Sequence, residues 1–208
     1  PQDGSGEYQS LEECQANCNL ELTYIPDDNF EQKLINLGYD NVMDDYVITN
    51  NINTLTYLNI GDSQISDLTG IEDFTQLTYL HCSNNELTDI NLSQNQQLVD
   101  LYCNDNQLTE LNLSQNSLIV NLYCSDNELT NLDISQNTLL VNLYCSNNEL
   151  ISLDVSQNAG LINLNCGTNL LTSLDLSQNT LLTNLYCSNN QIINLNVNLN
   201  TQLTKLYC

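Results

Sequence analysis

The chain has 208 residues, with 26 Asp and Glu against 2 Lys and Arg, which gives a formal net charge of −24. Nucleic-acid binding needs clustered basic side chains, so this composition excludes a nucleic-acid partner and disfavours anionic membrane surfaces. No apolar run reaches the roughly 18 residues that cross a bilayer, so we expect no membrane insertion. Hydrophobic residues still make up 41% of the chain, which is enough for a packed core.

Residues 1–21 are polar and contain glycine, which predicts a flexible or linker segment. Cys14 and Cys18 lie four residues apart within it, and we expect them to form a disulfide, which would fit an oxidising compartment. The chain does not begin with Met and shows no signal peptide, as a mature secreted protein or an excised fragment would.

Residues 22–54 are predicted to form a small helical N-terminal cap that covers the first turn of the following repeats. Within it, residues 25–38 have the pattern of a helix, with Asp27 or Asp28 as the N-cap and Gly38 at the end. The expected apolar stripe of this helix comprises Phe30, Leu34 and Leu37.

An acidic turn follows the helix, with Asp40, Asn41, Asp44 and Asp45. Calcium binding is one interpretation of this turn. The Gly and the terminal Glu of a calcium-binding EF-hand loop are missing, so a solvated turn is the preferred interpretation.

Residues 55–208 are internally repetitive and contain seven repeats plus a partial eighth. The clearest marker is a cysteine that recurs every 21 residues from the second repeat onwards, at Cys82, Cys103, Cys124, Cys145, Cys166, Cys187 and Cys208. Each cysteine ends the pattern L-x-x-L-x-C, whose alternation is typical of a strand with one buried face. A related pattern, as in LDISQNTL, forms the second half of each repeat.

The sequence therefore predicts a β-rich solenoid with two short parallel strands in each 21-residue turn. Stacked turns would form two parallel sheets around a narrow core, with a rise of about 4.8 Å per turn. One turn cannot bury its own apolar face, so stability must come from stacking.

The pattern L-x-x-L-x-C-x-x-N-x-L resembles the leucine-rich repeat family, with Cys in the third apolar position. The repeat length and the sequence L-x-x-L-D-L-S-Q-N resemble the short bacterial class called IRREKO. ISDLTGIEDFTQL at residues 65–77 resembles internalin repeats, and residues 24–40 are similar to the caps of secreted leucine-rich proteins of the Bacteroidota. These resemblances imply a bacterial protein that is secreted or exposed on the cell surface.

Two columns of asparagine recur inside the repeats, and their amides are expected to bond turn backbone groups. The columns are Asn85, Asn106, Asn127, Asn148, Asn169 and Asn190, and Asn95, Asn116, Asn137, Asn158, Asn179 and Asn200. The recurring cysteines are predicted to be buried free thiols, because in-register parallel strands hold their Cβ atoms too far apart for disulfides. A metal ladder is the alternative, but zinc needs four converging ligands.

The outward residues that flank the second Leu of each repeat form the candidate ligand-binding face. Its members are Tyr102, Tyr123, Tyr144, Tyr186 and Tyr207 in one column and Asn121, Asn142, Asn163 and Asn184 in the other. Aromatic rings beside amides suit a protein or a glycan. The alternative is that stacked rings only stabilise each other. Asn165 interrupts the tyrosine column, either through drift or as a shaped pocket.

The opposite side carries Asp133, Asp154 and Asp175 in one column. A bound cation would relieve the repulsion among them, although simple solvation is the preferred interpretation. We expect no metal site and no cofactor. His81 is the only imidazole and no catalytic motif occurs, so we do not expect an enzyme.

The last repeat would leave Leu203, Leu206 and Cys208 on an open apolar end. Either the chain is cut short, or a longer protein continues, or this end docks on another subunit. A head-to-tail contact of that kind would build a filament. The sequence thus predicts a surface-exposed binding or adhesion module, with a structural subunit of a filament or larger adhesin as the alternative.

Overall fold

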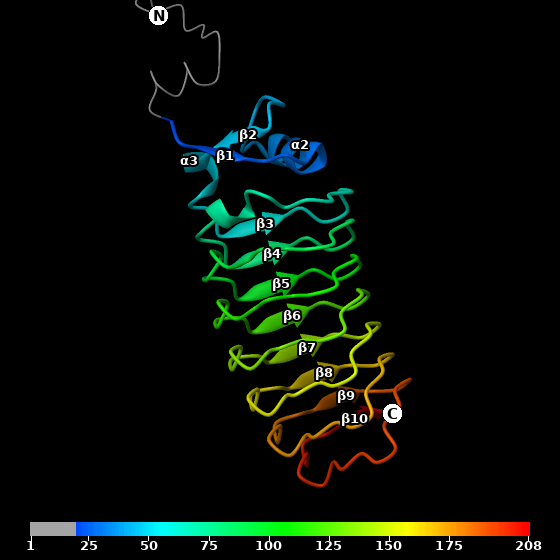
Figure 1. Ribbon diagram of the computed structural model, residues 1–208. Coiled ribbons are helices and arrows are strands. Elements are labelled where there is room, and N and C mark those ends of the chain that lie inside the picture. The colour runs from blue at the N-terminus through cyan, green and yellow to red at the C-terminus, as the bar shows by residue number, and fades with distance from the viewer. Residues whose placement is uncertain (1–19) are drawn as a thin grey trace, which may run out of the picture.

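The computed structural model describes residues 20–208 and shows a stack of similar turns with a small cap at its N-terminal end (Figure 1). The predicted Cys14–Cys18 disulfide lies outside the described residues. The solenoid prediction is confirmed, because the same strand recurs once in every turn and successive turns pair in parallel.

The cap contains a two-stranded antiparallel sheet and two helices. Strand β1 (Leu22–Tyr24) pairs with β2 (Tyr46–Ile48), and the helices are α2 (Asp28–Leu37) and α3 (Thr49–Ile52). Asp27 is the N-cap of α2 and accepts hydrogen bonds from the backbone N–H groups of Asn29 and Phe30, both at 2.9 Å. Gly38 ends the helix with φ 82°, in the left-handed conformation that suits glycine.

The predicted helix is therefore confirmed, but its apolar stripe is shorter than expected. Phe30 and Leu34 are fully buried, whereas Leu37 is 42% exposed. Leu37 is the last residue of α2.

The cap is fixed to the first turn by apolar packing and by one carboxylate. The rings of Phe30 and Phe74 stack with centroids 6.1 Å apart. Asp27 Oδ2 accepts hydrogen bonds from Ser66 N at 2.8 Å and Ser66 Oγ at 2.9 Å. Burial acts to raise the pKa of Asp27, but the hydrogen bonds from Ser66, Phe30 and Asp67 outweigh it and hold the pKa below its ordinary value.

One strand from each turn contributes to an eight-stranded parallel sheet, in the order β10-β9-β8-β7-β6-β5-β4-β3. The strands are β3 (Tyr57–Asn59), β4 (Tyr79–His81), β5 (Asp100–Tyr102), β6 (Asn121–Tyr123), β7 (Asn142–Tyr144), β8 (Asn163–Asn165), β9 (Asn184–Tyr186) and β10 (Lys205–Tyr207). A 3₁₀ turn, η1 (Ile71–Asp73), lies between β3 and β4. The middle leucine of each strand from β3 to β9 points into the core and is buried.

The prediction of a second strand in each turn is wrong, since only one parallel sheet is present in residues 20–208. The second half-repeat keeps its inward alternation, with Leu111 6% and Leu113 1% exposed, but it does not pair with its neighbours as a strand. Its backbone instead forms hydrogen bonds with nearby side chains; for example, Ser114 N donates to Asn112 Oδ1 at 3.1 Å. The alternation of apolar and polar residues indicates which side chains face inward. It does not indicate whether neighbouring turns lie close enough to pair as strands.

The cysteines that recur in each turn are free, as predicted, and those from Cys82 to Cys187 are at most 3% exposed. Cys208 is an exception to the expected burial, because it is exposed at the edge of the stack. Burial raises the pKa of the Cys103 and Cys145 thiols to about 12. These thiols act as small apolar side chains in the core.

Gly70 marks the tightest contact between the cap and the solenoid. It has φ 96°, and a Cβ there would lie 2.4 Å from Ile25 Cδ1 and 2.5 Å from Tyr24 O. We expect Gly70→Ala to lower the free energy of unfolding by about 3 kcal/mol, because strain and overpacking combine. Urea unfolding measures this loss. Gly38→Ala is the matched control, since it has φ 82° with nothing within 4 Å; a loss equal to that of Gly70→Ala would contradict the packing argument.

Candidate functional site: the tyrosine and asparagine sheet face

The outward face of the parallel sheet has two columns of side chains, one on each side of the buried leucines. The first and third residues of β4 to β9 are half-buried, whereas those of β10 are exposed. All nine predicted ligand-binding residues lie on this face, because they occupy equivalent positions in paired strands.

The tyrosines form a ladder of stacked rings. The ring centroids of Tyr102 and Tyr123 are 4.4 Å apart with an 8° angle between planes, and those of Tyr123 and Tyr144 are 4.7 Å apart at 8°. Tyr186 and Tyr207 stack separately, at 4.8 Å and 5°. The predicted tyrosines therefore divide into two groups, with Asn165 between them.

Two tyrosines that the sequence analysis did not assign extend the first group towards the cap. Tyr79 contacts Tyr102 diagonally at 5.3 Å, and Tyr57 stacks on Tyr79 at 4.6 Å. Both belong to the other outward column, so column position alone does not reveal them. They could have been found from the general rule that aromatic rings reach diagonal neighbours on the next strand of a sheet.

Stacking partly desolvates the phenol groups. Desolvation raises the pKa of Tyr79, Tyr102 and Tyr144 above the ordinary value, and the neighbouring tyrosines raise it further. Asp100 adds to this effect at Tyr79 and Tyr102. The ladder therefore presents neutral, partly dehydrated ring faces and edges, which favour contact with apolar or cationic groups.

The asparagine column forms a continuous chain of amide hydrogen bonds. Each Nδ2 donates to the residue one rung nearer the cap: Asn121 to Asp100, Asn142 to Asn121, Asn163 to Asn142 and Asn184 to Asn163. The carboxylate of Asp100 only accepts, so it fixes the direction of the whole chain. Lys205 occupies the rung after Asn184, at the far end of this column.

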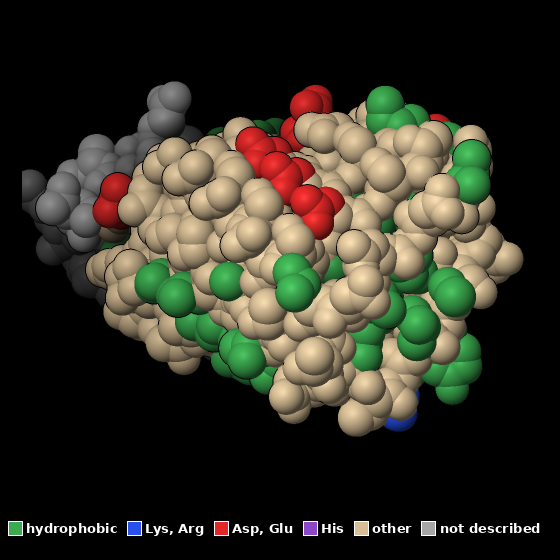
Figure 2. All heavy atoms as spheres, turned by 90° about the horizontal axis from the view of Figure 1, so that it is seen from below, with side chains coloured by type: hydrophobic (Ala, Val, Ile, Leu, Met, Phe, Trp, Pro, Cys, Tyr) green, Lys and Arg blue, Asp and Glu red, His purple; other side chains and the backbone are tan. Residues whose placement is uncertain are grey.

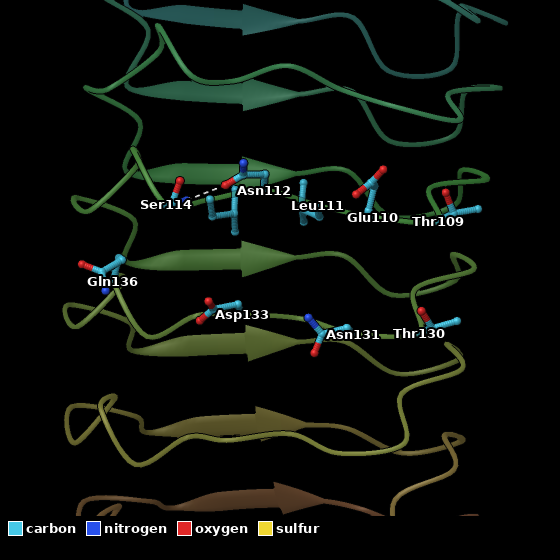
Figure 3. Close-up of a pocket in the computed structure, with 10 residues that line it drawn as sticks. Thr109, Glu110, Leu111, Asn112, Ser114, Thr130, Asn131, Asp133 and Gln136 are labelled. Carbon is cyan, nitrogen blue, oxygen red and sulfur yellow. Dashed lines mark hydrogen bonds between the residues drawn. The ribbon is translucent and has the colours of Figure 1, made fainter.

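The back of the solenoid carries open grooves between turns, which follow from the absence of a second sheet in residues 20–208. Figure 3 shows one of about 530 Å³, in which Glu110 and Asn112 from one turn lie near Asn131 and Asp133 from the next. Similar grooves recur between other turns. A groove that repeats with the turns is a product of the repeat, so it does not mark one specific site.

Acidic side chains form a row across a surface of mostly uncharged groups when the molecule is viewed from below (Figure 2). Asp133, Asp154 and Asp175 are exposed, and each accepts a hydrogen bond from the backbone N–H two residues later. Those bonds lower the pKa of all three carboxyl groups. Within residues 20–208, no group of three or more His, Cys, Asp or Glu side chains is arranged to hold a metal ion.

The described part of the chain contains no helix that is long and apolar enough to cross a membrane. Leu203 is partly buried, while Leu206 is 43% exposed and Cys208 is exposed. The structure thus places these three predicted assembly residues at the far end of the stack from the cap (Figure 1).

Comparisons with known proteins agree with this architecture. A family model described as leucine-rich repeats in two copies matches residues 53–95. Internalin J of Listeria monocytogenes is 39% identical over 72 residues, which cover 35% of this chain and 8% of that protein.

Solved structures extend the likeness to most of the chain. The functional domain of InlJ from Listeria monocytogenes, described as including a cysteine ladder, has a TM-score of 0.76 and 37% identity, covering 90% of this chain and 47% of that one. A leucine-rich repeat protein of Leptospira interrogans has a TM-score of 0.71 and 26% identity, covering 76% of this chain and 44% of that one. Internalin C2 of Listeria monocytogenes shares the fold, with a TM-score of 0.79 at 18% identity and coverage of 88% and 84%.

The chain therefore spans less than half of the InlJ domain and only a small part of the full Internalin J. Within that span the sequence identity of 37% is well above the 18% of Internalin C2, which shares the fold. Both this chain and the InlJ domain contain a column of cysteines. The fold of this chain, and its sequence over the matched span, are therefore similar to those of bacterial leucine-rich repeat proteins of the internalin type.

Proposed function

We propose that this chain is a non-catalytic module of a secreted or cell-surface bacterial protein and that it binds another protein through the tyrosine and asparagine sheet face. The observation that carries the proposal is the ladder of seven tyrosines beside a chain of bonded amides. Aromatic side chains with few rotatable bonds are enriched in protein interfaces. The amide chain holds its neighbours in place, so little conformational entropy is lost on binding.

The likeness to Internalin J and the InlJ domain supports the surface location. The charge of −24 supports a protein partner over a polyanion, because like charges repel. A glycan ligand is the competing outcome, since sugars also stack on tyrosine rings.

The double variant Tyr123→Ala with Tyr144→Ala tests this proposal. We expect it to fold and to lose affinity for the bound protein by about 30-fold, as removal of central aromatic contacts does. The measurement is binding to panels of purified extracellular proteins and of glycans. The control is Tyr24→Ala with Tyr46→Ala, which removes a tyrosine pair (ring centroids 5.3 Å apart) from the cap. Equal binding by the unmodified protein, the double variant and the control would exclude the sheet face as the binding site. Binding confined to the glycan panel would mean that the ligand is a glycan and not a protein.

A further inference from the structure

The tyrosine ladder lacks one ring, at Asn165. In the register of the sheet, Asn165 of β8 lies between Tyr144 of β7 and Tyr186 of β9. Neighbouring rings elsewhere in this column stack at 4.4–4.8 Å. Across the gap two rungs separate the flanking rings, which is about 9.6 Å. One flat group inserted there would stack on both rings at the ordinary aromatic distance.

The floor of this gap has no bulky side chain. Asn165 Oδ1 turns back to accept a hydrogen bond from Gly167 N at 3.2 Å. Gly167 adds no side chain, and the nearest atoms to a Cβ there would be Ser188 O at 3.3 Å and Asn165 Oδ1 at 3.5 Å. An acceptor oxygen is therefore present beneath the space between Tyr144 and Tyr186, and it can accept a second hydrogen bond.

The same Asn-x-Gly arrangement occurs in the first turn, where a side chain of the following rung contacts it. Asn59 and Gly61 repeat the pattern Asn-x-Gly, and Gly61 N donates to Asn59 Oδ1 at 3.1 Å. There the imidazole of His81 lies over the glycine, 2.5 Å from where a Cβ would be, and its Nδ1 is 2.9 Å from Asn59 Oδ1. A flat, nitrogen-bearing side chain from the next rung, which is the position equivalent to Tyr186, thus contacts the first Asn-x-Gly pair. At Gly167 the three atoms nearest to such a Cβ belong to Ser188 and Asn165 and not to a ring.

The same turn departs from the others at Thr168. This residue has φ 52° at a position where every other turn has Asn or Asp, the residues that best tolerate the left-handed conformation. A β-branched residue is strained there, and such strain is retained mainly at binding sites. The turn that carries the gap is therefore unusual at a second, adjacent position.

Charge selects among flat groups. The chain has only two basic residues and a net charge of −24, so it attracts cations. The guanidinium of arginine is flat, stacks on phenol rings and carries N–H groups that suit an amide oxygen. The ammonium of lysine is charged but not flat.

We propose that the gap between Tyr144 and Tyr186 binds one arginine side chain of a basic protein partner. The guanidinium lies between the two rings and donates an N–H to Asn165 Oδ1. This inference rests on the proposed function, since it specifies which side chain of the partner the sheet face recognises.

Small probes test the gap without the partner. The probes are N-acetyl-arginine amide, its citrulline analogue, which is flat but uncharged, and N-acetyl-lysine amide, which is charged but not flat. We expect the arginine probe to bind about fivefold more tightly than either control, as a desolvated cation–π contact allows. NMR shifts of the tyrosine rings and the Asn165 amide report binding. Equal binding of all three probes, or shifts elsewhere, would overturn the proposal.

Three variants localise the effect. Asn165→Tyr completes the ladder and should abolish arginine binding while the protein stays folded. Asn131→Ala changes an exposed residue on the back of the solenoid and should leave binding unchanged. Tyr123→Asn with Ser125→Gly opens a second gap between Tyr102 and Tyr144, and should add a second site. Undiminished binding by folded Asn165→Tyr would overturn the proposal, and so would no added site in the folded double variant.

The outcomes also separate this inference from the proposed function. Loss of partner binding in the variant Tyr123→Ala with Tyr144→Ala, with no preference for the arginine probe, would leave the function standing and reject the arginine slot. A specific arginine site with no protein partner would reject the function alone.

Discussion

Between pH 9 and pH 12 we expect this protein to lose its stability cooperatively. The Cys103 and Cys145 thiols have a pKa of about 12 in the folded chain against an ordinary value of 9.0, because both are buried. A folded pKa above the unfolded one gives a contribution that is complete below pH 9 and is lost as the pH rises towards 12. At pH 11 the two thiols together would have removed about 5 kcal/mol, which is comparable to the whole stability of many domains.

Other buried thiols shift in the same direction. Burial also raises the pKa of Cys82, Cys124 and Cys166. The raised pKa values of Tyr79, Tyr102 and Tyr144 add a further loss above pH 10. Urea unfolding followed by circular dichroism at several pH values measures the effect. Replacing Cys103 and Cys145 by Ala should reduce the dependence of the free energy of unfolding on pH above pH 9 by about 3 kcal/mol per pH unit. A stability that stays constant from pH 8 to pH 11 would contradict the burial of these thiols.

Asn127→Ala is expected to lower the free energy of unfolding by about 4 kcal/mol, since it removes three hydrogen bonds to buried backbone groups and leaves the backbone N–H of Leu108 without a partner. Asn127 Nδ2 donates to Cys103 O at 3.0 Å and Cys124 O at 3.2 Å, and its Oδ1 accepts from Leu108 N at 3.0 Å. These bonds connect two successive turns of the core, so their loss weakens the stack at its centre.

The matched control for this prediction is Asn131→Ala, in the same turn and exposed to solvent. Its effect should stay within about 0.5 kcal/mol. Thermal unfolding of Asn127→Ala and Asn131→Ala measures the loss of stability in each variant. Equal losses would mean that the buried amide is not what fastens the turns together.

The sequence predicted the solenoid correctly because a constant spacing between near-identical repeats leaves few other folds. It also predicted a helix within residues 25–38, which is observed from Asp28 to Leu37, and the inward amides, since caps and repeated polar residues have local causes. It did not predict that only one side of each turn forms a sheet, which depends on the distance between turns. The diagonal contact of Tyr79 with Tyr102 depends on ring orientation, which the register alone does not specify.

For the candidate site, the sequence located the columns and the interruption at Asn165 but not the floor of the gap. That floor depends on the hydrogen bond from Gly167 N to Asn165 Oδ1 and on the missing side chain at Gly167. The comparison with Asn59, Gly61 and His81 also needs coordinates, because His81 belongs to the next turn of the stack.

The uniform direction of the amide chain bears on how the length of this surface can change. Each interior asparagine donates towards Asp100 and accepts from the next rung. Duplication of a whole 21-residue unit would therefore insert one donor and one acceptor in phase, with no amide left without a partner. The recognition surface would grow by about 4.8 Å with each duplication. Unequal recombination between near-identical repeats would thus produce related proteins with different numbers of turns. Their surfaces could fit partners of different size, while the two ends of the solenoid stay the same.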